Sequence, residues 1–352
     1  MENALNKLII CAFRGGILSS LSAEGRITLL NYEREGSSLV GNIYLARVQN
    51  ILKNLDAAFL DIGERQPAYL SFGREKTLHH ADGTVQNSLK AGDEILVKIK
   101  KDAHKTKGPL AGSEFPELKE EELLQKAVFS KAPTLLRRTL PFFAQLAETT
   151  PLPDEIITDI PVVYAALTGE EPRLPKLYQE KLPARFRRES PPVLSLSSSV
   201  PVRFYADEAL PLTALWSLET ALKEATERRV WLKSGGTLII DPVEAMTVID
   251  VNTGKNIQGN DRQETIRKTD LEAADEVMRQ LRLRNLSGII LVDFIDLRRR
   301  EDRAALMDRL HALALLDPVK TQIVDITRLH LVEITRQKSG QTLAEQLRAA
   351  DR

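Results

Sequence analysis

Two acidic residues lie at the ends of strands that the sequence predicts at 247–251 and 289–293. Side chains alternate between the faces of a strand, so Asp250 and Asn252 share one face of the first strand. Apolar strands of an α/β sheet are buried along their length and ligands bind beyond their carboxyl ends, where Asp293 also lies. Two neighbouring carboxylates repel each other unless a cation binds between them, and Mg²⁺ suits such an oxygen-rich site. The pattern predicts a magnesium centre; the alternative is that each aspartate caps the turn or helix after it.

A second group of residues has the composition of a nucleic-acid surface. Lysines cluster at the end of one predicted strand, and aromatic side chains lie on two nearby strands. The residues are Lys98, Lys100, Lys101, Lys105, Lys107, Phe59 and Tyr69. Aromatic faces beside a cationic groove bind single-stranded nucleic acid. The alternative is that Phe59 belongs to a core and the lysines protect an exposed strand edge.

The composition excludes several other kinds of site. The chain has 352 residues, with 49 basic and 49 acidic side chains and no formal net charge. Its single cysteine, Cys11, excludes a disulfide framework and every cysteine-based zinc site, since these need two or more thiols. No apolar run approaches the ~20 residues of a membrane helix, and Leu8–Phe13 is too short for a signal peptide. We expect a soluble, cytoplasmic protein that binds no membrane.

The elements that must position these residues change along the chain. Short strands with glycine-rich turns predict a small β-barrel of the OB type, and alternating strands and helices follow later. Thr269–Glu272 fits a capping box, which predicts that a helix starts there. The fold class is α/β, in fuller terms an α+β arrangement of several subdomains. The expected divisions are 1–35, a β-meander belonging to the later α/β domain; 36–107, the barrel; 108–200, a helical connector; 201–340, the α/β domain; and 341–352, a helical tail.

Three stretches of sequence resemble the ribonuclease E/G endoribonucleases. They are Gly41–Tyr44 with Ala57–Gly63, then Ser234–Gly254, then Leu271–Arg284 with Asp293–Leu297. The resemblance covers most of the chain. It implies an RNase H-like catalytic domain with an inserted OB-fold barrel that binds RNA. It also implies that single-stranded RNA is cleaved with the help of Mg²⁺.

The same resemblance implies roles for particular residues. Asp250 and Asp293 match the acids that hold the metal in the family. The implied catalytic residues are Asp250, Asn252, Asp293 and Lys320, the last at a position that is commonly basic near the active site. The implied RNA-binding residues, one of them a tyrosine where the family usually has phenylalanine, are Phe59, Tyr69 and Lys107.

Two features of the family have no counterpart in this sequence. The family carries, after the barrel, a strand-rich sensor with an Arg-Thr pair that recognises a 5′-monophosphate, whereas here Gly108 leads almost directly to a charged helix. Arg138-Thr139 is not interpreted as that pair, because it lies within a later landmark of the family. The family's Cys-Pro-x-Cys zinc link should follow 331–337, where this sequence has no cysteine. We therefore expect a compact form without zinc-linked assembly, either a monomer or a dimer.

The expected function is Mg²⁺-dependent endonucleolytic cleavage of single-stranded RNA, in RNA processing or decay, largely independent of 5′-end phosphorylation. Cleavage would leave a 5′-phosphate and a 3′-hydroxyl, as the resemblance implies. One alternative is a non-catalytic RNA-binding paralogue, against which the joint presence of Asp250, Asn252 and Asp293 argues. Another is an unrelated metal-dependent phosphoesterase for small molecules, which would not need the barrel.

Overall fold

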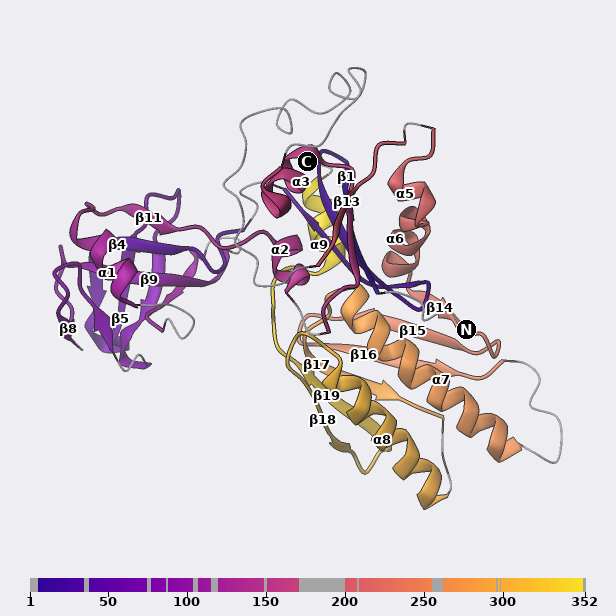
Figure 1. Cartoon of the computed structure of the whole chain (residues 1–352). Coiled ribbons are helices and arrows are strands. Elements are labelled where there is room, and N and C mark those ends of the chain that lie inside the picture. Colours follow the sequence, from indigo (N-terminus) through magenta and orange to yellow (C-terminus); the bar gives the residue numbers. More distant parts are fainter. Residues whose placement is uncertain are drawn as a thin grey trace. The chain divides into compact units, whose positions relative to one another are not determined.

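The chain forms two compact units in a computed structural model (Figure 1). One unit comprises Met1–Glu35 and Phe142–Arg352, and the other comprises Gly36–Pro141. The structure describes residues 6–34, 38–74, 77–86, 88–103, 107–114, 120–148, 151–170, 200–207, 209–254, 262–295, 297 and 299–350.

The Gly36–Pro141 unit is built on a closed five-stranded barrel, which confirms the predicted OB-like module. The strands are β4 (Ile43–Leu52), β5 (Ala57–Asp61), β6 (Ala68–Ser71), β9 (Glu94–Lys101) and β10 (Leu110–Gly112). They follow the order β4-β5-β6-β10-β9, and β4 also pairs with β9, so the ring closes. Small and aliphatic side chains fill its interior, as expected for a narrow barrel. The unit also contains β7 (Leu78–His79), β8 (Val85–Gln86), α1 (Glu120–Val128) and β11 (Thr134–Arg137).

The segment 108–200 is not a separate helical connector. Its first part contributes β10 to the barrel and β11 to the outer edge of β4. Its second part contributes α2 (Phe142–Ala147), β12 (Glu155–Thr158) and α3 (Pro161–Thr168) to the other unit. Strand β12 has three consecutive buried residues, so it lacks the alternation that marks a strand in sequence. Residues 171–199 lie outside the described part of the chain.

The N-terminal meander lies in the same unit as the C-terminal half of the chain. It forms β1 (Lys7–Phe13), β2 (Gly16–Ala23) and β3 (Arg26–Glu33). The sheet has the order β13-β12-β1-β2-β3, in which β12 and β13 (Val202–Phe204) run parallel to β1. Its core includes side chains from α5 (Leu212–Leu215), α6 (Leu218–Thr226) and the start of α9 (Leu343–Ala350).

A second sheet in this unit has six strands and one helix-covered face. The order is β14-β15-β16-β17-β19-β18. Helices α7 (Arg262–Leu283) and α8 (Arg300–Leu315) lie against one face, where aliphatic side chains form the largest core cluster (Figure 1). We call the opposite face the open face. The strands are β14 (Arg229–Trp231), β15 (Thr237–Pro242), β16 (Met246–Asn252), β17 (Gly288–Asp293), β18 (Thr321–Ile326) and β19 (Leu331–Arg336).

Helix α7 begins eight residues before the position that the capping box predicted. Thr269 lies inside the helix, where its hydroxyl donates to the carbonyl of Thr265. The Glu272 carboxylate instead accepts the backbone N–H of Ser234, at 3.1 Å, in the turn between β14 and β15. The motif therefore reflects tertiary contacts and not a helix start. None of the helices that the structure describes, α7 included, is long and apolar enough to cross a membrane.

Candidate metal centre and nucleic-acid interface

The two candidate metal ligands are direct neighbours across two parallel strands. In the β16–β17 pair, the Cα partner of Asp250 is Asp293. Ile249 and Val292, which precede them, are fully buried under α7 and α8, whereas both aspartates are exposed. Because side chains alternate along a strand, the carboxylates project from the open face. The sequence predicted that Asp250 and Asp293 lie at the rim of the sheet. In the structure both acids are near the ends of their strands, but their side chains project from the open face.

Asn252 fixes the orientation of one of these carboxylates. Its side-chain amide donates to Asp250 Oδ2 at 2.5 Å. Both residues are on the same side of β16, as the alternation predicted. The contact occupies one Asp250 oxygen and leaves the other directed to solvent or to a ligand. Outer hydrogen bonds of this kind hold metal ligands in one geometry.

This set of oxygens fits a hard divalent cation. Two in-register carboxylates bring like charges together at an exposed position, and a cation relieves their repulsion. Across the described ranges, no group of three or more His, Cys, Asp or Glu side chains could hold a metal. Mg²⁺ needs only one or two carboxylates, because it keeps several waters. Asp296 and residues 255–261, which follow the two strands, are outside the described residues.

A buried carboxyl, Asp270, lies beneath the end of β17. It is fully buried in α7, and its Oδ1 accepts the backbone N–H of Ile295 at 3.1 Å. Its Oδ2 has no hydrogen-bond partner among the described residues, and burial raises the pKa of the group to about 7. Ile295 is two residues after Asp293, so Asp270 holds the turn that follows the metal-site strand.

The sequence contains a signal for Asp270 that the capping interpretation hid. Asp270 is four residues after Ile266 and four before Ala274, and both of these are buried in the core. Residues at this spacing lie on one helix face. An aspartate in the middle of an apolar stripe therefore predicts a buried carboxyl with a specific partner.

On the barrel, Phe59 and Tyr69 form a pair on the outer surface. They are direct partners in β5–β6, with ring centroids 5.8 Å apart and planes at 66°. Both are half-buried, while their neighbours Leu60 and Leu70 fill the interior. This geometry answers the alternative that Phe59 is a core residue. Two adjacent aromatic rings on an exposed barrel face can stack with nucleobases.

Basic side chains continue this aromatic row. Leu110 is the partner of Tyr69 in β6–β10, and Lys101 is the partner of Leu110 in β9–β10. Lys107 is exposed, two residues before Pro109, whose carbonyl accepts the Tyr69 N–H at 2.7 Å. The structure thus brings Phe59, Tyr69 and Lys107 to one region of the barrel. Lys105 lies outside the described residues.

Lys320 is not part of the acid cluster. Strands β17 and β18 both run antiparallel to β19, so they point in the same direction. Lys320 precedes β18, and its carbonyl accepts the N–H of Gln337, beyond the far end of β19. Asp293 is level with Leu331, at the other end of β19. Six residues of strand separate the two levels, which is about 20 Å, so the structure does not bring Lys320 to the acid pair.

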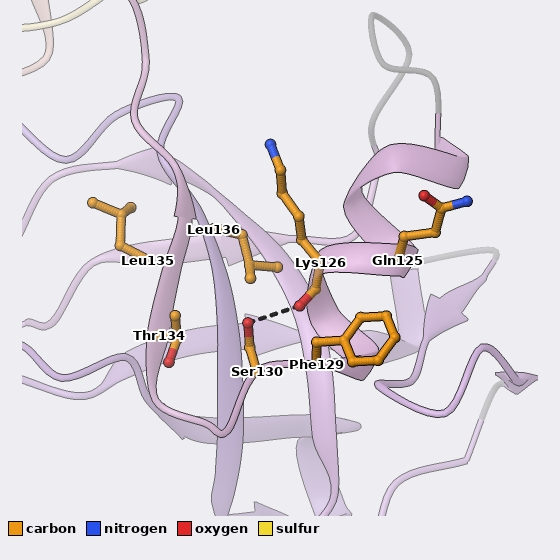
Figure 2. Close-up of a pocket in the computed structure, with 7 residues that line it drawn as sticks. All are labelled: Gln125, Lys126, Phe129, Ser130, Thr134, Leu135 and Leu136. Carbon is orange, nitrogen blue, oxygen red and sulfur yellow. Dashed lines mark hydrogen bonds between the residues drawn. The ribbon is translucent and has the colours of Figure 1, made fainter. Parts of the chain in front are cut away.

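One surface hollow of the barrel unit has none of these residues in its lining. Figure 2 shows its wall, formed by α1, the turn after it and β11. Ser130 donates to the carbonyl of Lys126 at 2.7 Å, and Phe129 is 91% exposed. Its lining residues include no carboxylate and only one cationic side chain. They therefore offer no means of hydrolysis.

Comparison with known proteins finds similarity to ribonucleases E and G. Residues 192–339 match the family model described as Ribonuclease E/G family. The chain is 31% identical to Ribonuclease E of Synechocystis sp. over 88% of its own length and 54% of that protein. It is 28% identical to Ribonuclease E of Escherichia coli K12, over 86% of its length and 34% of the relative. It is also 28% identical to Ribonuclease G of the same strain, over 91% of its length and 77% of the relative.

A barrel of the OB type and an in-register acid pair thus occur in a chain that is similar to ribonucleases E and G over most of its length. Residues 192–339 match the ribonuclease E/G family, and most of the chain is similar to proteins of that family. The chain spans about half the length, or less, of the ribonuclease E relatives that it matches.

Proposed function

We propose that the protein is an endoribonuclease that cleaves single-stranded RNA with Mg²⁺, in RNA processing or decay in the cytoplasm. The observation that carries the proposal is the direct pairing of Asp250 with Asp293 on the open face. Similarity to the family supports the class of reaction. The aromatic pair and lysines of the barrel support a single-stranded substrate, since stacking on exposed rings needs unpaired bases.

We propose a separate role for each residue of the site. Asp250 and Asp293 would hold the cation, and Asn252 would keep Asp250 in one orientation. A bound Mg²⁺ activates water and neutralises charge on the scissile phosphate. Phe59, Tyr69 and Lys107 would hold the strand through its bases and backbone, without strong selection of sequence.

The decisive experiment uses the purified protein and a single-stranded RNA labelled at its 5′ end. We expect cleavage only with Mg²⁺ present, and products that carry a 5′-phosphate and a 3′-hydroxyl. Binding without cleavage, with or without Mg²⁺, would favour the non-catalytic paralogue. Cleavage that persists after chelation would contradict the metal assignment.

We further propose that cleavage is largely independent of the 5′-end phosphate. After β9, strand β10 completes the barrel and β11 pairs with β4, and α1 lies between β10 and β11 in the chain. A pocket for a terminal phosphate needs convergent donors such as a forked Arg. The stretch after β10 is instead rich in glutamate, from Glu114 to Glu122. Arg185–Arg188, another basic stretch, lies outside the described residues.

The test of end independence compares one RNA with a 5′-hydroxyl, a 5′-monophosphate or a 5′-triphosphate. We expect the three cleavage rates to be nearly equal. A several-fold preference for the monophosphate would show that the chain has a pocket for that group.

A further inference from the structure

An exposed tryptophan lies on the same sheet face as the candidate metal ligands. Trp231, in the edge strand β14, is 68% exposed, although a large aromatic side chain usually buries most of its surface. Its strand partner is Thr237, and the next partner across the sheet is Asn252. The neighbouring row runs from Arg229 through Ile239 to Asp250. Trp231 and Arg229 therefore lie two strands away from Asp250, about 10 Å across the sheet, and three strands away from Asp293.

A cationic group accompanies the exposed ring. The Arg229 guanidinium carbon lies 6.0 Å from the Trp231 ring centroid. Within the part of the chain that the structure describes, no carboxylate forms an ion pair with Arg229. The adjacent Arg228 differs, because it binds Asp241 through two hydrogen bonds of 2.6 and 2.7 Å. The charge of Arg229 thus remains available to an anionic ligand beside an aromatic face.

We propose that Trp231 and Arg229 form a base-stacking subsite for the single-stranded RNA, next to the catalytic acids. A nucleobase would stack on the Trp231 ring, and the Arg229 guanidinium would contact the adjoining phosphate. This combination is the general chemistry of single-strand recognition. The inference deepens the proposed function and rests on it, since the register places the subsite beside Asp250 and Asn252.

The sheet face itself favours a nucleotide over a protein partner. Exposed Trp and Arg are also common at protein interfaces, but those interfaces have a core depleted of charge. Here the rows that contain Trp231 and Arg229 lead to a polar amide, Asn252, and to two carboxylates, Asp250 and Asp293, that form no ion pair with any described residue. Closure by a protein would bury these charges at high cost. An RNA strand that brings a cation to the acids leaves none of them unpaired.

The first test follows Trp231 without depending on catalysis. The chain has two tryptophans, so Trp216→Phe leaves Trp231 as the only one. Adding Asp293→Asn prevents turnover during the titration. We expect an unlabelled single-stranded oligouridine to quench Trp231 emission, with the same midpoint as the anisotropy change of a labelled copy. Binding without any change in emission would overturn the subsite and leave the proposed function intact. Absence of binding to the wild-type chain would overturn both.

The second test asks whether the ring acts through a base. We expect Trp231→Ala to lower kcat/KM about 5- to 150-fold, which matches loss of one base–aromatic stack. Trp231→Phe should restore most of this loss. An RNA with one abasic position, moved stepwise around the cleavage site, should at one position lose its sensitivity to Trp231→Ala. A structural role would instead give the same loss on every RNA.

A matched control is Leu315→Ala, which removes an 87% exposed apolar side chain from α8, on the other side of the sheet. It should leave binding and cleavage unchanged. Trp231→Ala could instead abolish self-association and leave RNA binding and cleavage unchanged. That result would identify a protein interface and overturn the proposal.

Discussion

The barrel and the six-stranded sheet each present a row of in-register side chains on an exposed face, but the two rows have opposite chemistry. The barrel row is Phe59, Tyr69, Leu110 and Lys101. The sheet row is Arg229, Ile239, Asp250 and Asp293. The first can contact RNA directly through rings and cations. The second ends in two negative charges, which repel a phosphate backbone unless a metal ion is bound.

The two faces also differ in what supports them. Behind the barrel row lie small and aliphatic side chains such as Ala58, Leu60 and Leu70, all fully buried. Behind the acid pair, the turn after Asp293 depends on a buried carboxyl, Asp270. We therefore expect that binding and cleavage can be separated by mutation, because different elements would carry them.

The largest expected effect is at the acid pair. Asp250→Asn or Asp293→Asn should lower cleavage by far more than the 10- to 100-fold typical of an outer-sphere partner, while single-strand affinity is retained. Asn252→Ala should fall within that 10- to 100-fold range, because it removes only the orienting hydrogen bond. Rates measured against Mg²⁺ concentration, with RNA binding measured separately, check both expectations.

A matched control for these variants is Asp325→Asn. Asp325 is an exposed carboxylate on the edge strand β18 of the same sheet. It should cleave at the wild-type rate. Wild-type turnover by Asp250→Asn or Asp293→Asn would show that the acids are not the metal ligands.

Next in size is the effect of the barrel row on affinity. Loss of a stacking ring in Tyr69→Ala should weaken single-strand binding by about 1–3 kcal/mol, and Tyr69→Phe should restore it. Lys107→Ala should reduce the salt dependence of binding by roughly 0.7 in log–log slope, as expected for one phosphate contact on a single strand. Phe129→Ala removes a 91% exposed ring elsewhere on the same unit and serves as the control. Equal affinities in all variants would place the RNA on another face.

A smaller effect is expected in the pH dependence of stability. Burial raises the pKa of Asp270 from an ordinary 3.8 to about 7, so between these values the folded chain holds a proton that the unfolded chain has lost. Stability therefore falls as pH rises through this window, at roughly 1.4 kcal/mol per pH unit at most. Asp270→Asn keeps an acceptor for the Ile295 N–H and should remove the fall.

Thermal melts from pH 4 to pH 8, without divalent ions, test this expectation. The stability gained by Asp270→Asn over wild type should grow up to about pH 7 and then level off. Asp159→Asn should behave alike but level off earlier, because burial raises the pKa of Asp159 only to about 6. Melting curves of variant and wild type that stay parallel across the range would contradict the assignment.

The local sequence pattern predicts much of the fold and part of the candidate site. The barrel strands, the strands that hold Asp250 and Asp293, and the shared face of Asp250 and Asn252 all follow from alternation and glycine placement. Strand pairing does not, because it depends on contacts between distant segments. The direct opposition of Asp250 and Asp293 is such a pairing, and so is the inclusion of β12 in the N-terminal sheet.

The smallest expected effect concerns Lys320. It compares two basic residues, Lys320 and Arg328, that lie at opposite ends of the six-stranded sheet. Lys320 is exposed at the start of β18, about 20 Å along the strands from Asp293. Arg328, in the turn between β18 and β19, is instead level with the acids, because Thr327 bonds to Leu331, the partner of Asp293. We expect Lys320→Ala to leave kcat/KM unchanged and to alter stability by no more than about 0.5 kcal/mol, because its contact within the described residues is the backbone hydrogen bond from Gln337, which alanine keeps. Arg328→Ala should cause a measurable loss of RNA affinity that shrinks at high salt. The opposite result would be a loss of RNA affinity or kcat/KM in Lys320→Ala but not in Arg328→Ala. It would mean that the RNA runs along the open face toward Lys320, beyond the acid pair.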